Sequence, residues 1–136
     1  MSGGKFVLDS YAVLALVEDE PGAETVAEIV ARETAELYMS VVNLGEVYYI
    51  IVRKQGERAA EDVVRGVTEE EGLTLAEVTW PRAKEAARIK AGGGLSYADA
   101  FVLGLGRELG APVVTGDPEI RDAAGGLGVE VVWIGA

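Results

Sequence analysis

The sequence predicts an α/β protein with a mostly parallel sheet that helices cover on both faces. Short apolar runs, several of them rich in valine and each too short for a helix, alternate with stretches in which apolar residues recur at helical spacing. The runs are apolar almost without interruption, which is typical of parallel strands that are buried on both faces. No linker-like segment and no internal repeat interrupts this alternation, so we expect a single domain over residues 1–136.

The expected elements follow one another closely along the chain. In order they are strand 6–8, helix 11–17, helix 23–32, strand 37–39, helix 42–53, helix 57–70, strand 73–76, helix 81–91, helix 97–109, strand 112–115 and strand 129–134. Charge pairs four residues apart indicate exposed helix faces, Glu28 with Arg32 and Glu61 with Arg65. The triplet 117–119, Asp-Pro-Glu, is the pattern of a helix cap, a proline at the first helical position and an acid in the first turn.

The composition limits the chemistry that this chain can perform. A chain of 136 residues can bury roughly two thirds of the surface exposed by its unfolded form, so it needs no disulfide or structural zinc. The sequence contains neither cysteine nor histidine. Nucleophilic triads that depend on those residues are therefore excluded, and so are the usual zinc, copper and haem sites. A metal site in this chain must use oxygen ligands, which suit Mg²⁺ and Mn²⁺.

The charge and the hydropathy bear on partners and location. Twelve Lys and Arg residues against 23 Asp and Glu residues give a net charge of −11, which disfavours a general nucleic-acid binder unless cations intervene. The mean hydropathy of +0.20 suggests that a partner or a second copy covers some apolar surface. Without a cysteine, a signal-peptide pattern or an apolar run of membrane-spanning length, the chain is expected to be cytoplasmic and not to contact a membrane.

Three aspartates stand where a helix cap would explain them. Asp9 follows the first strand and Asp117 follows the fourth, and each can accept a hydrogen bond from the start of the next helix. Asp99 lies in Ser96-Tyr97-Ala98-Asp99, a capping-box pattern. Its neighbours three and four positions away are mostly apolar, so it faces the buried side of its helix. Capping and a role in a functional site remain open for all three.

Glu46 has no such local explanation. It lies in the middle of helix 42–53, and its neighbours at helical spacing are Val42, Asn43, Tyr49 and Ile50. A carboxylate buried without a partner costs several kcal/mol unless its pKa rises or a cation meets it. Several acids without local bases would also repel one another, and a divalent cation converts that repulsion into binding. The sequence therefore predicts an oxygen-liganded metal site.

Four segments of the chain resemble the PIN-domain ribonucleases, and among them the small VapC-type toxins of prokaryotic toxin–antitoxin pairs. They are FVLDSYAVLAL with Asp9, SVVNLGEVYY with Glu46, LSYADAFVLGLG with Asp99 and VVTGDPEI with Asp117. In that family the first acid ends the first strand, the glutamate lies on a helix after the second strand, and two further acids follow in this order. The resemblance extends from Lys5 to Ile134.

The resemblance implies a three-layer α/β/α sandwich that binds Mg²⁺ or Mn²⁺ and hydrolyses RNA phosphodiester bonds with an activated water. Asp9, Glu46 and Asp99 would hold the metal, and Asp117 would complete the site directly or through water. The resemblance also implies a homodimer and a cognate antitoxin that holds the enzyme inactive. Basic residues at 82, 84, 88 and 90, or at 53, 54 and 58, are candidates to guide RNA towards the acids.

Three further residues are supporting candidates. Thr115 would orient Asp117 or a metal-bound water through its hydroxyl, or would simply be a threonine at a strand end. Ser10 and Ser40 would contact the phosphate or fill polar loops.

Other functions remain open. A PIN-like scaffold without activity that binds protein or RNA is one, and a DNase with the same acidic site is another. A haloacid-dehalogenase-like phosphatase is disfavoured because the position two residues after the first aspartate is Tyr11.

Overall fold

The structure is a computed structural model that describes residues 4–136, and it is built around a five-stranded sheet in which every paired strand is parallel. The strands are β1 (Lys5–Leu8), β2 (Glu36–Ser40), β3 (Leu73–Ala76), β4 (Val113–Thr115) and β5 (Val131–Trp133), in the spatial order β3-β2-β1-β4-β5. Strands β2 and β3 are added on one side of β1, and β4 and β5 on the other, so the strand order reverses between β1 and β4. This is the position at which open parallel sheets form their functional sites.

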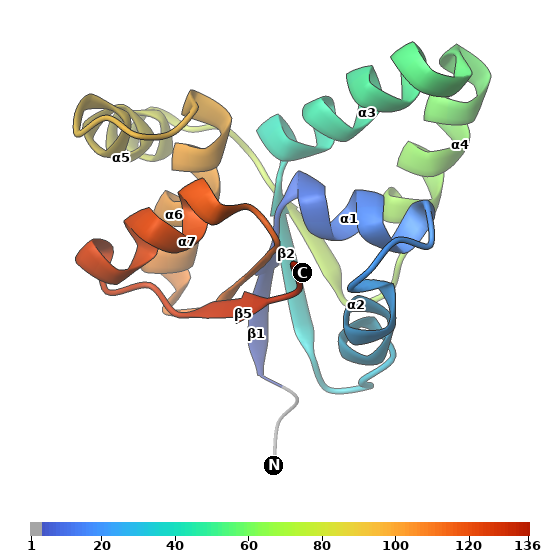
Figure 1. Ribbon diagram of the computed structural model, residues 1–136, viewed down its shortest axis with the longest axis horizontal. Coiled ribbons are helices and arrows are strands. Elements are labelled where there is room, and N and C mark those ends of the chain that lie inside the picture. The colour runs from blue at the N-terminus through green and yellow to red at the C-terminus, as the bar shows by residue number, and fades with distance from the viewer. Residues whose placement is uncertain (1–3) are drawn as a thin grey trace.

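Seven α-helices and one 3₁₀ turn cover the two faces of the sheet in the described residues. They are α1 (Ser10–Val17), α2 (Ala23–Val30), α3 (Val41–Gln55), α4 (Glu57–Thr68), α5 (Trp80–Ala91), α6 (Tyr97–Leu109), α7 (Pro118–Ala124) and the 3₁₀ turn η1 (Gly125–Leu127). Figure 1 shows α1 to α4 on one side of the sheet and α5 to α7 on the other. The prediction of a parallel α/β sheet covered on both faces is confirmed.

Alternate residues of the strands supply two separate apolar cores. In β1, Val7 packs with α5, α6 and α7, whereas Leu8 packs with α1, α2, α3 and α4. In β4, Val113 and Val114 divide in the same way. This alternation is the period of two that a strand imposes on its side chains, and it explains why the strands carry apolar residues at almost every position.

The eleven expected elements are present, and their ends differ by a few residues. The strand expected at 129–134 pairs only over Val131–Trp133, although the Ile134 N–H still donates to the Thr115 carbonyl at 3.0 Å. The element missing from the expected list is α7, for which the sequence offered a cap but too short an apolar pattern. None of the helices within residues 4–136 combines the length and apolar character of a membrane span.

Gly22 allows the start of α2 to lie against the end of the chain. Its φ is +98°, and a Cβ atom there would lie 2.6 Å from the Ile134 carbonyl oxygen. We expect Gly22→Ala to lower the free energy of unfolding by roughly 2–4 kcal/mol, because it adds a backbone clash to a left-handed conformation. Gly128→Ala is the control, since φ is +69° and no atom lies within 4 Å. Urea unfolding that gives equal losses for both variants would contradict the clash.

Candidate metal centre

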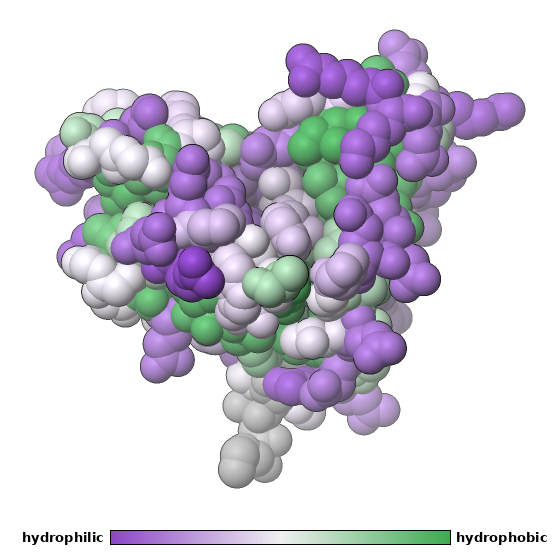
Figure 2. All heavy atoms as spheres, viewed as in Figure 1, coloured by the Kyte–Doolittle hydropathy of each residue, from purple (hydrophilic) through white to green (hydrophobic). Residues whose placement is uncertain are grey.

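The predicted acidic residues lie at the carboxyl ends of the central strands, where four helices begin. Asp9 is the N-cap of α1 directly after β1, and Asp117 is the N-cap of α7 two residues after β4. Glu46 lies on α3, which follows β2, and Asp99 lies in the first turn of α6. Figure 2 shows the surface hollowed between the arm that carries α5 to α7 and the arm that carries α3 and α4.

A hydroxyl group joins the ends of β1 and β4. Asp9 is almost fully buried, and its Oδ1 accepts a hydrogen bond from the Ala12 N–H at 2.8 Å, which is the capping role that the sequence allows. Its Oδ2 accepts a hydrogen bond from the buried Thr115 hydroxyl. The Thr115 oxygen in turn accepts the Asp117 N–H at 3.0 Å. Thr115 therefore orients the Asp9 carboxylate with its proton and the Asp117 backbone with its oxygen.

Three carboxylates approach one another closely enough to share an ion. Oxygen atoms of Asp99, Asp117 and Glu119 lie within 4.8 Å of each other. Asp117 and Asp99 are half-buried, Glu119 is exposed, and the Glu119 N–H donates to the Asp117 Oδ1 at 2.9 Å. Glu119 was not among the predicted site residues, because an acid after a cap and a proline is typical of an ordinary first helical turn. Only the direction of α7 brings it beside Asp99.

Asn43 connects Glu46 to the part of α6 that carries Asp99. The Asn43 amide nitrogen donates to the Glu46 Oε1 and to the Ala98 carbonyl oxygen, each at 3.1 Å. Ala98 directly precedes Asp99 on α6, so this side chain links the two helices that carry Glu46 and Asp99. From the sequence, Asn43 was only a helical neighbour of Glu46. Its reach to α6 depends on how the helices pack.

Burial and mutual repulsion raise the pKa of two of the acids. Burial raises the pKa of Asp9 to about 7; the hydrogen bonds from Thr115 and Ala12 oppose the rise, and the charges on Asp99 and Asp117 add to it. The pKa of Asp99 rises to about 6, chiefly through burial and then through the charge on Asp117, with a smaller contribution from Glu46. These couplings indicate that the four predicted acids share one electrostatic environment.

The basic side chains of residues 4–136 do not neutralise this group. All six ion pairs in that range involve other acids, among them Lys54 with Glu18 at 3.2 Å and Arg82 with Glu108 at 3.0 Å. A clustered set of oxygen ligands without a protein cation is the donor set of a hard divalent ion. The residues present thus fit Mg²⁺ or Mn²⁺.

The ion pairs bear on two expectations about the charged helix faces and revise one of them. Arg32 pairs with Glu28 as expected, at 2.9 Å. Arg65 instead bonds Asp62, at 3.0 Å and three residues away, so the expected pair with Glu61 is wrong. The i,i+3 geometry lets the shorter Asp side chain meet the guanidinium on the same exposed face.

The two serine candidates occupy different positions. Ser10 is the half-buried first residue of α1, next to Asp9. Ser40 is buried, and its hydroxyl oxygen caps α3 by accepting the Val42 N–H at 3.2 Å. Ser40 also lines a pocket of about 480 Å³ that α5 and α6 border, together with Arg82 and Glu85. The structure therefore gives Ser40 a capping role and places it at the margin of a second hollow.

Comparisons with known proteins agree on one fold. A family model described as PIN domain matches residues 6–126. The structure is similar to VapC20 of Mycobacterium tuberculosis, described as a sarcin-ricin loop cleaving toxin, with a TM-score of 0.74, 20% identity and coverage of 87% of this chain and 94% of that one. A comparison with curated proteins found no match.

Two toxin–antitoxin structures give similar values. The DNA-bound VapBC of Salmonella typhimurium has a TM-score of 0.71 and 20% identity, and the match covers 97% of this chain and 98% of that one. VapBC-1 of nontypeable Haemophilus influenzae has a TM-score of 0.70 and 15% identity, and the match covers 95% and 97%. At these identities the likeness concerns the fold.

Proposed function

The chain belongs to the PIN domain family, and from this premise we propose that it is a Mg²⁺- or Mn²⁺-dependent endoribonuclease, the toxin of a type II toxin–antitoxin pair. The observation that carries the proposal is the group of carboxylates at the strand ends, which no basic side chain in the described part of the chain neutralises. The proposal also draws on the family resemblance of the four segments and on the similarity to solved VapC toxins.

The proposed roles follow from the contacts of each acid. Asp99 and Asp117 would hold the ion, with Glu119 close enough to take part, and Glu46 and Asp9 would complete the acidic group. When bound, the ion would lower the pKa of a water molecule and neutralise charge that develops on the phosphate. Thr115 would hold the Asp9 carboxylate in one orientation through its hydroxyl proton and the start of α7 through its hydroxyl oxygen.

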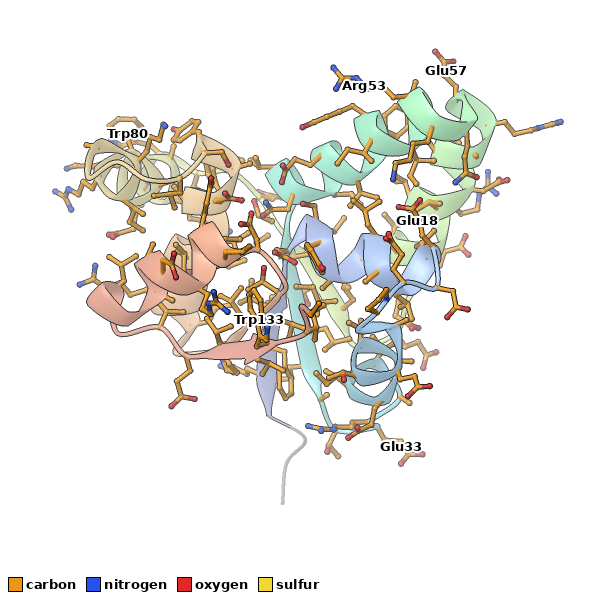
Figure 3. All side chains as sticks on the ribbon, in the orientation of Figure 1. Glu18, Glu33, Arg53, Glu57, Trp80 and Trp133 are labelled. Atoms are coloured by element: carbon orange, nitrogen blue, oxygen red, sulfur yellow. The ribbon has the colours of Figure 1, made fainter. Side chains whose placement is uncertain are left out.

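Because the chain has a net charge of −11, RNA binding requires basic side chains close to the acidic site. Among the basic residues suggested by the sequence, Arg82 and Lys54 are engaged in ion pairs. Arg53 is exposed and lies over the Tyr49 ring, with 5.1 Å between the guanidinium carbon and the ring centroid. Figure 3 shows Arg53 and Glu18 on opposite sides of α3. We propose that Arg53 is available to contact the RNA backbone, because no acid within the described range 4–136 forms an ion pair with it.

We further propose a cognate antitoxin and a second copy of the chain as partners. The proposal rests on the similarity to solved toxin–antitoxin complexes and on the apolar side chains that the chain exposes. Trp80 is 72% exposed at the start of α5, where Figure 3 shows it at the outer end of one arm. Leu16, Val17, Tyr49 and Val78 are also exposed. Surfaces of this kind commonly serve as interfaces.

Incubation of the purified protein with defined RNAs tests the proposal. We expect cleavage with Mg²⁺ or Mn²⁺, no cleavage with EDTA, and recovery when the metal is returned in excess. The same assay with single-stranded DNA of equal sequence separates a ribonuclease from a DNase. Cleavage in EDTA at the full rate would contradict the metal-dependent mechanism, and a failure to cleave any RNA would favour the scaffold function.

A further inference from the structure

Asn43 is the buried polar side chain whose contacts the proposed mechanism does not explain. It is 1% exposed in the third position of α3 and is the single asparagine of the sequence. Both groups that its amide nitrogen meets, the Glu46 carboxylate and the Ala98 carbonyl, can only accept hydrogen bonds. The NH₂ end of the amide must therefore face them, which fixes the orientation of the side chain.

The other end of the amide is unpaired. Asn43 Oδ1 is the one buried side-chain polar atom without a hydrogen-bond partner among residues 4–136. Burying an acceptor without a partner costs about 1–3 kcal/mol. An apolar side chain of similar size would fill this position without that cost. The position therefore uses the two N–H donors, whose targets are the Glu46 carboxylate and the backbone next to Asp99.

These contacts fix Glu46 relative to the other acids. Glu46 sits on a long helix and, among the described residues, no basic side chain forms an ion pair with it. Within residues 4–136, the side chain of Glu46 accepts one hydrogen bond from another side chain, the bond from Asn43. The second bond from the same nitrogen ties α3 to the first turn of α6, where Asp99 lies. One nitrogen thus contacts both the Glu46 carboxylate and the residue directly before Asp99.

We propose that Asn43 is a positioning residue for the metal centre, which holds Glu46 in place against Asp99 and acts on metal affinity through the Glu46 carboxylate. The inference rests on the proposed metal site but not on the choice of RNA as the substrate. Side chains that orient metal ligands typically change metal affinity by 10-fold to 100-fold when they are replaced.

Titration of each variant with Mn²⁺, followed by the electron paramagnetic resonance signal of the free ion, measures this effect without an activity assay. We expect Asn43→Ala to weaken Mn²⁺ binding about 10-fold. Asn43→Leu should weaken it equally, because leucine fills the volume but lacks the donors. Val47→Ala is the matched control: Val47 is fully buried in the core on the same helix, so its replacement loosens the packing and should leave Mn²⁺ affinity within about 2-fold.

A double-mutant cycle with Glu46→Gln separates positioning from a general loosening of the site. If Asn43 acts through the Glu46 carboxylate, Asn43→Ala should change Mn²⁺ affinity less than about 2-fold in the Glu46→Gln background. An undiminished 10-fold effect in that background would overturn the inference. So would unchanged binding by both Asn43 variants while the wild type binds Mn²⁺. A wild type that binds no Mn²⁺ would overturn the proposed metal site itself.

Discussion

Replacing Asp99 by asparagine is expected to reduce metal-dependent RNA cleavage by roughly 100-fold or more while the fold is kept. Asp99 is the acid that couples to both Asp117 and Glu46 and that shares the three-carboxylate group. Asparagine keeps the size of the side chain and one acceptor oxygen for the capping box with Ser96, but it removes the charge that an ion requires. Initial rates at saturating Mg²⁺ measure the loss.

The same substitution should stabilise the protein when metal is absent. The pKa of Asp99 is raised to about 6 by burial and by neighbouring acids, so ionising it at pH 8 opposes folding. Asp122→Asn is the matched control, because it removes one charge from the exposed surface of α7. There the Asp122 Oδ1 lies 3.8 Å from the Arg121 Nε. We expect near-normal cleavage from this control. Cleavage by the Asp99 variant above half the wild-type rate would contradict a metal role for Asp99.

The stability of the metal-free protein is expected to fall as the pH rises from about 4 to about 7. The unfolded chain loses the Asp9 proton near the ordinary value of 3.8, whereas the folded protein holds it up to about 7. Between these values the folded state binds more protons, so the free energy of unfolding decreases as the pH rises. For Asp9 alone the difference is up to roughly 4 kcal/mol, present in full below pH 4 and lost above pH 7.

Divalent metal should reverse this trend. Mg²⁺ or Mn²⁺ competes with protons for the carboxylates, so we expect the metal to stabilise the protein more at pH 8 than at pH 5. Urea unfolding in EDTA and in excess Mg²⁺ at the two pH values measures both effects. Asp9→Asn supplies the control, because it keeps the cap acceptor and removes the titrating group. A metal effect that is independent of pH, or the same pH slope in this variant, would contradict the account.

Local patterns predicted the strands and helices because each of these elements is marked by the apolar pattern of its own residues. The valine-rich runs became the strands, since strands buried on two faces need apolar residues on both. Capping was one of the two roles left open for Asp9 and Asp117 from their neighbours alone, and the structure gives each of them a capping hydrogen bond. The prediction of the ion pair between Glu61 and Arg65 failed, because Arg65 pairs with Asp62 instead. Both acids lie at helical spacing from Arg65, so side-chain rotamers decide between them.

Two residues of the site were beyond reach of the sequence pattern. Glu119 looked like a helix-start acid and Asn43 like a polar helical neighbour. Their importance comes from distances to Asp99 and Ala98, which lie 20 and 55 residues away along the chain. Thr115 was selected as a partner of Asp117 or of water, yet its proton goes to Asp9 across 106 residues. These contacts exist only once α3, α6 and α7 are docked on the sheet.

The sequence by itself determined the type of fold and the exclusion of thiol and imidazole chemistry, and it predicted that four acids share one site. It could do so because composition and periodicity act through neighbouring residues. Only the tertiary structure decided which oxygen atoms face one another, because that depends on where parallel strands β1 and β4 end and how the helices beyond them start. Burial and repulsion between carboxylates then raise the pKa values of Asp9 and Asp99, and both effects arise only when distant segments are packed together.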